Sequence, residues 1–195
     1  MIITPLGIAG SPVMLAEIFP PEAILMSLED RSKESVIENL VRHAVALGHV
    51  PSSAASALVR SIQDREKLGT TALGNGICFP HCRSRFTERF VGVAGFLTSR
   101  IPFDSLDAEP VDSVFLVLAP HEQRGRFLEI LGRLVAIGRD KSLGALLRGC
   151  RTADHVSSFL QELDLHEMDE PEGRRGNQRL VKRSYLHPVQ PDGHL

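Results

Sequence analysis

Apolar positions in the first third of the chain repeat at the spacing of a helix. From Val36 to Leu47 they recur every three or four residues, as on the buried face of a helix. Ser32 stands before this stretch as a plausible N-cap, and Gly48 follows it as a plausible stop. A similar spacing predicts a second helix over residues 53–64.

Shorter apolar stretches in the middle of the chain are typical of strands instead. Residues 90–98 and 114–119 are rich in apolar side chains, and the second stretch is apolar on both faces, which predicts a central strand. Residues 77–81 predict a short strand stopped by Pro80, after which the chain should leave the sheet for the surface. Residues 101–104 predict a brief edge strand.

The helical spacing returns after Pro120. A stripe of apolar residues from Phe127 to Val135 ends at Gly138, and further patterns predict short helices over 141–148 and 153–163. Two helices, then several strands, then three helices predict an α/β (α+β) domain. In this domain the helices cover a small mixed sheet.

The last thirty residues differ in composition from the rest. Residues 166–195 contain charged residues and prolines but almost no periodic apolar positions, which predicts a polar, disordered tail. Residues 1–165 are predicted to form one domain, since a chain of 195 residues has little room for two full cores. With 43% hydrophobic and 24% charged residues, the chain as a whole is not disordered.

Charge and hydropathy exclude several classes of protein. The net charge of −2 leaves no excess of positive charge for binding nucleic acid or an anionic membrane. No run of about 18 apolar residues could span a membrane, and residues 1–16 lack the basic start of a signal peptide. Three cysteines are too few for a disulfide framework. We therefore expect a cytoplasmic protein that neither binds nucleic acid nor inserts into a membrane.

Candidate chemistry is concentrated in the glycine-rich segment 65–81, which reads REKLGTTALGNGICFPH. Glycines let a partner approach the main chain closely. His81 ends the segment, and a neutral imidazole is a competent nucleophile because its ordinary pKa is about 6.5. Phosphoryl transfer needs in-line positioning and cationic donors, and Arg65 and Arg83 are the nearby candidates. The spacing alone leaves open a purely structural role for His81.

Other chemistries fit this segment less well. Cys78, His81 and Cys82 could bind zinc, but no fourth ligand stands at a familiar spacing, and Cys78 within an apolar strand is predicted to be core. The glycine-rich loop lacks the Lys-Ser/Thr ending of a P-loop and precedes its strand, which excludes a nucleotide loop of that kind. We expect neither a metal nor a cofactor.

The segment 65–81 resembles the signature of the type-2 EIIA domains of the bacterial phosphotransferase system, in its fructose, mannitol and nitrogen-regulatory branch. Similar landmarks are Ser32-Lys33-Glu34, Ile101-Pro102-Phe103 and Leu118-Ala119-Pro120, so that the resemblance covers about residues 15–163. It implies a three-layer α/β/α sandwich around a mixed sheet.

The resemblance also implies a function. It makes His81 the residue that accepts a phosphoryl group from the phosphocarrier protein HPr, and Arg65 the arginine that supports it. Because no substrate-translocating membrane domain is fused to the chain, we expect a regulatory role in nitrogen or carbon metabolism rather than sugar transport. A regulatory target protein is a possible second partner.

Two positions differ from the family pattern. Phe127 stands where the family usually has a second histidine, and a phenyl ring cannot donate a hydrogen bond. Cys82 stands where the family tends to have glycine or alanine, and we expect its larger side chain to crowd the partner's approach. These differences leave a second hypothesis open. In it, the chain is a weakened EIIA-like binding module that docks a regulatory partner without phosphoryl transfer.

Overall fold

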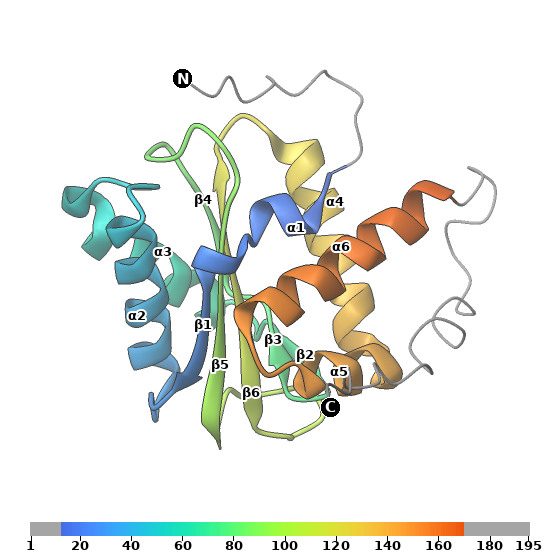
Figure 1. Ribbon diagram of the computed structural model, residues 1–195. Helices are drawn as coiled ribbons and strands as arrows, with labels where there is room; N and C mark the ends of the chain where they lie inside the picture. The colour runs from blue at the N-terminus through green and yellow to red at the C-terminus, as the bar shows by residue number, and fades with distance from the viewer. Residues whose placement is uncertain (1–12, 170–195) are drawn as a thin grey trace, which may run out of the picture.

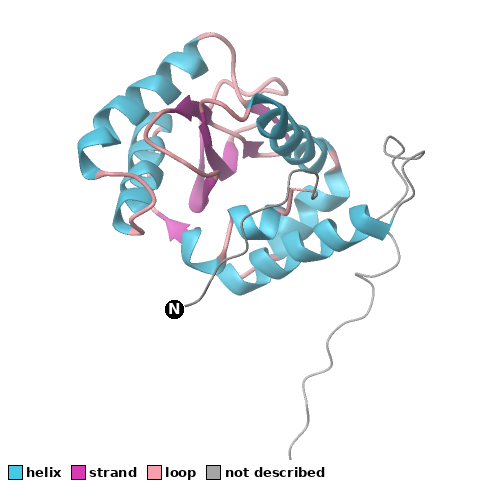
Figure 2. Ribbon diagram, turned by 90° about the horizontal axis from the view of Figure 1, so that it is seen from above, coloured by secondary structure: helices cyan, strands magenta, loops and turns pink. Residues whose placement is uncertain are grey.

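A mixed six-stranded sheet lies between two layers of helices (Figures 1 and 2). The computed structural model describes residues 13–169, and side chains as far as residue 166. One face of the sheet is covered by α2 (Lys33–Ala46) and α3 (Ala55–Lys67). The other face is covered by α1 (Leu15–Ile18), α4 (Arg124–Arg139), α5 (Lys141–Gly149) and α6 (Ala153–Asp169). The predicted three-layer α/β/α arrangement is confirmed.

The strand order of the sheet is β1-β5-β6-β3-β2, with β4 also paired to β6. The β1–β5, β3–β6 and β4–β6 pairs are parallel, whereas the β5–β6 and β2–β3 pairs are antiparallel. The strands are β1 (Ile24–Leu28), β2 (Ala72–Gly74), β3 (Ile77–Cys78), β4 (His81–Ser84), β5 (Val91–Ile101) and β6 (Val111–Pro120). As predicted, β6 is central, since it pairs with β5 on one side and with β3 and β4 on the other.

The strands β3 and β4 follow β6 in a single register. Ile77 lies opposite Ser113, and His81 lies opposite Val117. Pro80 between them has no N–H to donate, but its carbonyl accepts a hydrogen bond of 2.9 Å from the Val117 N–H. The prediction that the chain leaves the sheet after Pro80 is therefore wrong. The proline interrupts the ladder without ending it, and His81 begins a second strand.

Alternation along these strands divides the side chains between two apolar cores. Ile77 and Phe79 pack on the side of α4, α5 and α6, whereas Cys78 and Cys82 pack on the side of α2 and α3. Burial raises the pKa of both thiols, that of Cys82 to about 12. The prediction that Cys78 is core is confirmed. The prediction that Cys82 crowds an approaching partner is wrong, because this side chain is buried on the sheet face opposite His81.

The predicted edge strand over residues 101–104 is also wrong. Ile101 is the last residue of β5 and pairs with Val111. Asp104 has a φ of 52°, a left-handed conformation that a strand does not use. Phe103 between them is fully buried, so its apolar character reflects a loop that packs against the core. Conversely, β1 was not predicted from the sequence.

The helices begin and end largely where the sequence predicts. The Ser32 hydroxyl accepts a hydrogen bond from the Ser35 N–H in a capping box at the start of α2, and Gly48 adopts a φ of 71° just past its end. The last helix, α6, continues to Asp169, beyond the predicted end at residue 163. Residues 170–195 of the predicted tail lie outside the described residues. Among the described residues, no helix combines the length and the apolar character needed to cross a membrane.

Candidate functional site

His81 is placed by the strand β4 beneath the first turns of α4. It pairs with Val117 of β6, which ends at Pro120, and α4 begins at Arg124 directly afterwards. The rings of His81 and Phe127 meet edge to face, with centroids 5.5 Å apart and planes at 68°. The His81 side chain is half-buried. The strand β4, which carries His81, and the helix α4, which carries Phe127, together fix the position of the imidazole.

The two nitrogens of the His81 ring have different surroundings. Nδ1 lies 2.8 Å from the carbonyl oxygen of Phe79. Because a carbonyl only accepts, Nδ1 carries the proton in the neutral ring, and Nε2 keeps its lone pair. Burial is the main cause that lowers the pKa of His81 below 6.5, the Phe79 hydrogen bond raises it, and the charge of Arg65 lowers it again. The environment therefore favours the neutral imidazole.

Near His81 stands a group of polar residues, which we call the polar wall: Arg65, Glu66 and the loop of residues 69–71, whose Thr71 carbonyl accepts a 3.2 Å hydrogen bond from the Phe79 N–H. Arg65 lies in the last turn of α3, and its Nη1 donates a 2.9 Å hydrogen bond to the carbonyl of Gly69. Its positive charge acts on the His81 pKa, so the structure brings the two predicted site residues into one neighbourhood. Arg83, the other cationic candidate, lies two residues further along β4 and is exposed.

The polar wall is held by a buried carboxylate that sequence reasoning missed. Glu66 is only 5% exposed. Its oxygens accept hydrogen bonds from the N–H and the hydroxyl of Thr71, and one of them lies 3.3 Å from Nζ of Lys33. This network ties the end of α3 to the loop and to the start of α2. Both Lys33 and Glu66 belong to stretches that resemble the family, but nothing in the sequence indicates that they pair.

Phe127 is an apolar neighbour of His81. Phe127 is 8% exposed and belongs to the core formed with Ile130 and Leu134 of α4. The prediction that Phe127 extends the apolar stripe of its helix is confirmed, and its ring lies directly against the imidazole. Position 127 thus borders the imidazole of His81, as the resemblance implies, but supplies no hydrogen-bond donor. His121 and Arg124, the polar residues nearby in sequence, are exposed.

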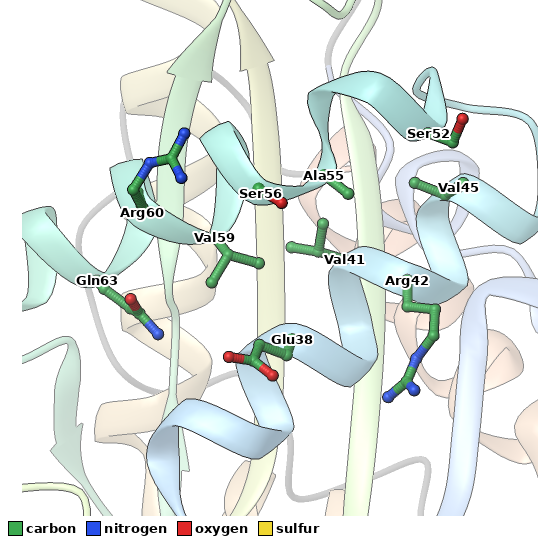
Figure 3. Close-up of a pocket in the computed structure, with 10 residues that line it drawn as sticks. All are labelled: Glu38, Val41, Arg42, Val45, Ser52, Ala55, Ser56, Val59, Arg60 and Gln63. Atoms are coloured by element: carbon green, nitrogen blue, oxygen red, sulfur yellow. The ribbon is translucent and has the colours of Figure 1, made fainter.

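An open groove lies elsewhere, between α2 and α3 (Figure 3). Its volume is about 570 Å³, and Val41 and Val59 point toward each other across it. Neither His81 nor Arg65 lines it. No group of three or more His, Cys, Asp or Glu side chains that could hold a metal ion exists among the described residues. The candidate site is therefore the His81 neighbourhood.

Comparison with known proteins identifies similar chains and folds. A nitrogen regulatory protein of Bradyrhizobium diazoefficiens is 35% identical over 146 residues, which are 75% of this chain and 94% of that protein. One of Pseudomonas aeruginosa is 30% identical over 151 residues, covering 77% and 97%. The crystal structure of the nitrogen regulatory protein IIA-Ntr from Neisseria meningitidis has a TM-score of 0.69 at 27% identity, covering 76% of this chain and 99% of that one.

The mannitol IIA of Escherichia coli shares the fold, with a TM-score of 0.60 at 22% identity over 71% of this chain and 96% of that one. The family described as "Phosphoenolpyruvate-dependent sugar phosphotransferase system, EIIA 2" matches residues 17–163, which include the whole His81 neighbourhood. The chain is a member of this type-2 EIIA family of phosphotransferases, which work through a phosphohistidine.

Proposed function

We propose that this protein accepts a phosphoryl group on Nε2 of His81 from an HPr-like phosphocarrier and acts in regulation rather than in sugar transport. The observation that carries the proposal is the hydrogen bond between Nδ1 and the Phe79 carbonyl. It fixes the tautomer, so that Nε2 is the nucleophilic nitrogen. The lowered pKa of His81 keeps that nitrogen unprotonated at neutral pH.

In the proposed step, the Nε2 lone pair attacks the phosphorus of a phosphohistidine on the carrier. A new N–P bond forms as the carrier's N–P bond breaks, and the electron pair of the broken bond returns to the carrier's imidazole. No oxidant, metal or additional proton is needed. The protein contributes positioning and charge stabilisation, which are the main requirements of phosphoryl transfer.

Arg65 is the proposed source of that positive charge. It belongs to the polar wall that borders His81, and the bond from Nη1 to the Gly69 carbonyl uses one of its five N–H donors. The remaining donors can meet the oxygens of a phosphoryl group on Nε2. Glu66 is a positioning residue in this scheme, since it orders the loop to which Arg65 is bonded.

The relatives support a regulatory role. Those named above are nitrogen regulatory proteins, matched over nearly their whole length. We propose that the phosphorylated and unphosphorylated forms of this chain differ in their binding to a regulatory target protein in the cytoplasm. Addition of a doubly charged group to a half-buried imidazole changes both charge and shape at this surface.

A labelling experiment tests the proposal. The protein is incubated with the general phosphotransferase components and labelled phosphoenolpyruvate, and wild type is compared with His81→Ala. His121→Ala, which changes an exposed histidine of the neighbouring turn, is the matched control. We expect acid-labile label on wild type and on the control but not on His81→Ala. Equal label on all three, or label on none, would contradict the proposal.

A second candidate function is a docking module that binds a partner at the His81 face without taking up phosphate. Phe127 favours it, because the ring that faces the imidazole has no donor for a phosphoryl oxygen. Absence of label from wild type, with partner binding retained by wild type and lost on His81→Glu, would favour this function over phosphoryl transfer.

A further inference from the structure

One pair of residues next to the β2–β3 ladder forms only one of its two backbone hydrogen bonds. Ala72 pairs with Cys78, so the antiparallel register places Thr71 opposite Phe79. A hydrogen-bonded pair in such a ladder ordinarily exchanges two N–H···O bonds. The Phe79 N–H donates to the Thr71 carbonyl at 3.2 Å, but the return bond from the Thr71 N–H to the Phe79 carbonyl is not formed within residues 13–169.

The Thr71 N–H donates to a carboxylate instead. Glu66, in the last turn of α3, accepts this N–H on Oε2 at 3.3 Å and the Thr71 hydroxyl on Oε1. Nζ of Lys33 lies 3.3 Å from the same Oε2, so the carboxylate is also anchored to α2. An ionised carboxylate is a stronger acceptor than a backbone carbonyl. The Thr71 N–H is therefore drawn away from its partner in the ladder.

The Phe79 carbonyl is thereby left to the imidazole. Nδ1 of His81 lies 2.8 Å from its oxygen. Phe79 itself is fixed from two directions, since its N–H is held by Thr71 and its buried ring lies 6.1 Å from that of Phe115. The carbonyl has little freedom to turn. What bonds to it depends on whether the Thr71 N–H is available.

We propose that Glu66 is a positioning residue for the reaction and that it sets the tautomer of His81. The inference rests on the proposed function. By accepting the Thr71 N–H, the carboxylate keeps the Thr71–Phe79 pair open and reserves the Phe79 carbonyl for the imidazole. The proton of the neutral ring then stays on Nδ1, and the lone pair that attacks phosphorus stays on Nε2. This action is separate from the ordering of the loop to which Arg65 is bonded.

Loss of the carboxylate should redistribute the ring proton. The Thr71 N–H could then close the pair with Phe79, and the carbonyl would be shared between two donors. The bond that favours the proton on Nδ1 is weakened as a result. Part of the His81 population then carries its proton on Nε2, where no lone pair is available for attack.

The nitrogen shifts of the His81 ring test this directly. Protein with ¹⁵N-labelled histidines is followed by NMR at a pH of about 8.5, where the ring is neutral, and His81→Ala assigns the signals. In wild type we expect a pyrrole-like shift for Nδ1 and a pyridine-like shift for Nε2. Glu66→Met fills similar space without a strong acceptor and should move both shifts toward a common average. Glu66→Gln retains an oxygen for the Thr71 N–H and should restore the wild-type shifts.

Two control variants exclude other causes. Asp164→Leu removes a different buried carboxylate, which pairs with Arg133 at 2.7 Å between α6 and α4, and so controls for loss of stability. Arg65→Gln controls for loss of the guanidinium near the ring. Both should keep the wild-type pattern of shifts.

The rate of labelling gives a second readout. In the Arg65→Gln background, Glu66→Met should slow phosphorylation about a further tenfold, because about one ring in ten then keeps the reactive tautomer. Glu66→Gln in the same background should restore most of that loss. If Glu66 acted only through Arg65, the second substitution would have no additional effect.

Several results would overturn the proposal. They are a proton on Nε2 in wild type, wild-type shifts in folded Glu66→Met, or averaged shifts in Asp164→Leu as well. Should Glu66→Met not fold, Glu66→Asp decides instead. It keeps the charge near Lys33 but shortens the side chain by one methylene, and it should also give averaged shifts, whereas wild-type shifts would count against the proposal.

The ring shifts require neither carrier nor phosphate, so they separate this proposal from the proposed function. Absence of label from wild type, with ring shifts that respond to Glu66 as expected, removes phosphoryl transfer alone. Label on wild type, with ring shifts indifferent to Glu66, removes the positioning role alone.

Discussion

His81 has two groups of neighbours that differ in chemistry, the polar wall on one hand and Phe127 on the other, and each contains a buried side chain. The polar wall supplies a guanidinium and a loop ordered by a buried carboxylate. The other group is the ring of Phe127, which belongs to the apolar core. Glu66 is 5% exposed and Phe127 is 8% exposed, so burial alone does not distinguish the group that carries charges from the group that carries none.

Comparison of the two sides separates groups that position the imidazole from groups that could stabilise a transferred phosphoryl group. Phe127 restricts the imidazole by contact and contributes to its burial, which lowers the pKa. It does this without any group that could bond to phosphate. Of the two, only the polar wall has charged groups that could stabilise negative charge developing on a transferred phosphoryl group. A chain with one such side should transfer phosphate, but more slowly than one that has a donor on both.

The largest effect is expected from Glu66→Ala. Removal of this carboxylate leaves Lys33 without its buried partner and the Thr71 N–H without an acceptor. We expect a loss of about 3 kcal/mol in the free energy of unfolding, together with slower labelling because Arg65 is no longer held. Chemical denaturation measures the first effect. Glu162→Ala, at an exposed position of α6, is the control and should change stability by less than about 0.5 kcal/mol.

Arg65→Gln tests the polar wall without disturbing the core, because the Arg65 side chain is only half-buried. We expect the rate of phosphorylation to fall about a hundredfold, as when one preorganised donor is removed from a charged transition state. Stability should change little. Arg60→Gln, one turn earlier on α3 and exposed, should transfer at the wild-type rate. An equal fall in both variants would show that the helix, rather than Arg65, is responsible.

The sequence predicted the polar wall in part. The signature placed Arg65 and His81 in one segment, and the structure brings them together because α3 and β4 are in contact. It did not predict the pairing of Glu66 with Lys33, since the two residues are separated by a helix, a turn and another helix, and no periodicity links them. Pairings of this kind depend on how elements pack, which local patterns do not specify.

The two strand predictions that the structure contradicts have a common physical origin. Pro80 lacks an N–H and therefore predicts the end of a strand, yet its carbonyl accepts a hydrogen bond from the Val117 N–H. The edge strand was predicted from Phe103 and its neighbours, whereas Asp104 turns the chain at positive φ. In both cases the pattern of apolar residues correctly indicated burial. The pattern of apolar residues did not indicate which backbone groups form hydrogen bonds within the sheet.

Phe127→His places a hydrogen-bond donor on the apolar side of His81. It should reduce the difference between this side and the polar wall. We expect phosphorylation to become about tenfold faster, equivalent to one additional hydrogen bond of about 1.4 kcal/mol to the transferring group. Phe127→Leu retains an apolar side chain and is the matched control. If the histidine variant transfers no faster than the leucine variant while both remain folded, the missing donor does not limit the reaction.

The smallest expected effect is a shift in the pKa of His81. Both the apolar side and the polar wall act on this pKa, and their contributions can be separated. Burial is the leading cause of the lowered pKa and Arg65 a lesser one. The imidazole should therefore titrate with a midpoint below 6.5 when its ring signals are followed by NMR. Phe127→Ala opens the apolar side to water and should move the midpoint upward, toward 6.5. Arg65→Gln should move it in the same direction but less, because it removes a charge and leaves the burial in place. A larger shift from Arg65→Gln than from Phe127→Ala would mean that charge, and not exclusion of water, sets the protonation of the ring.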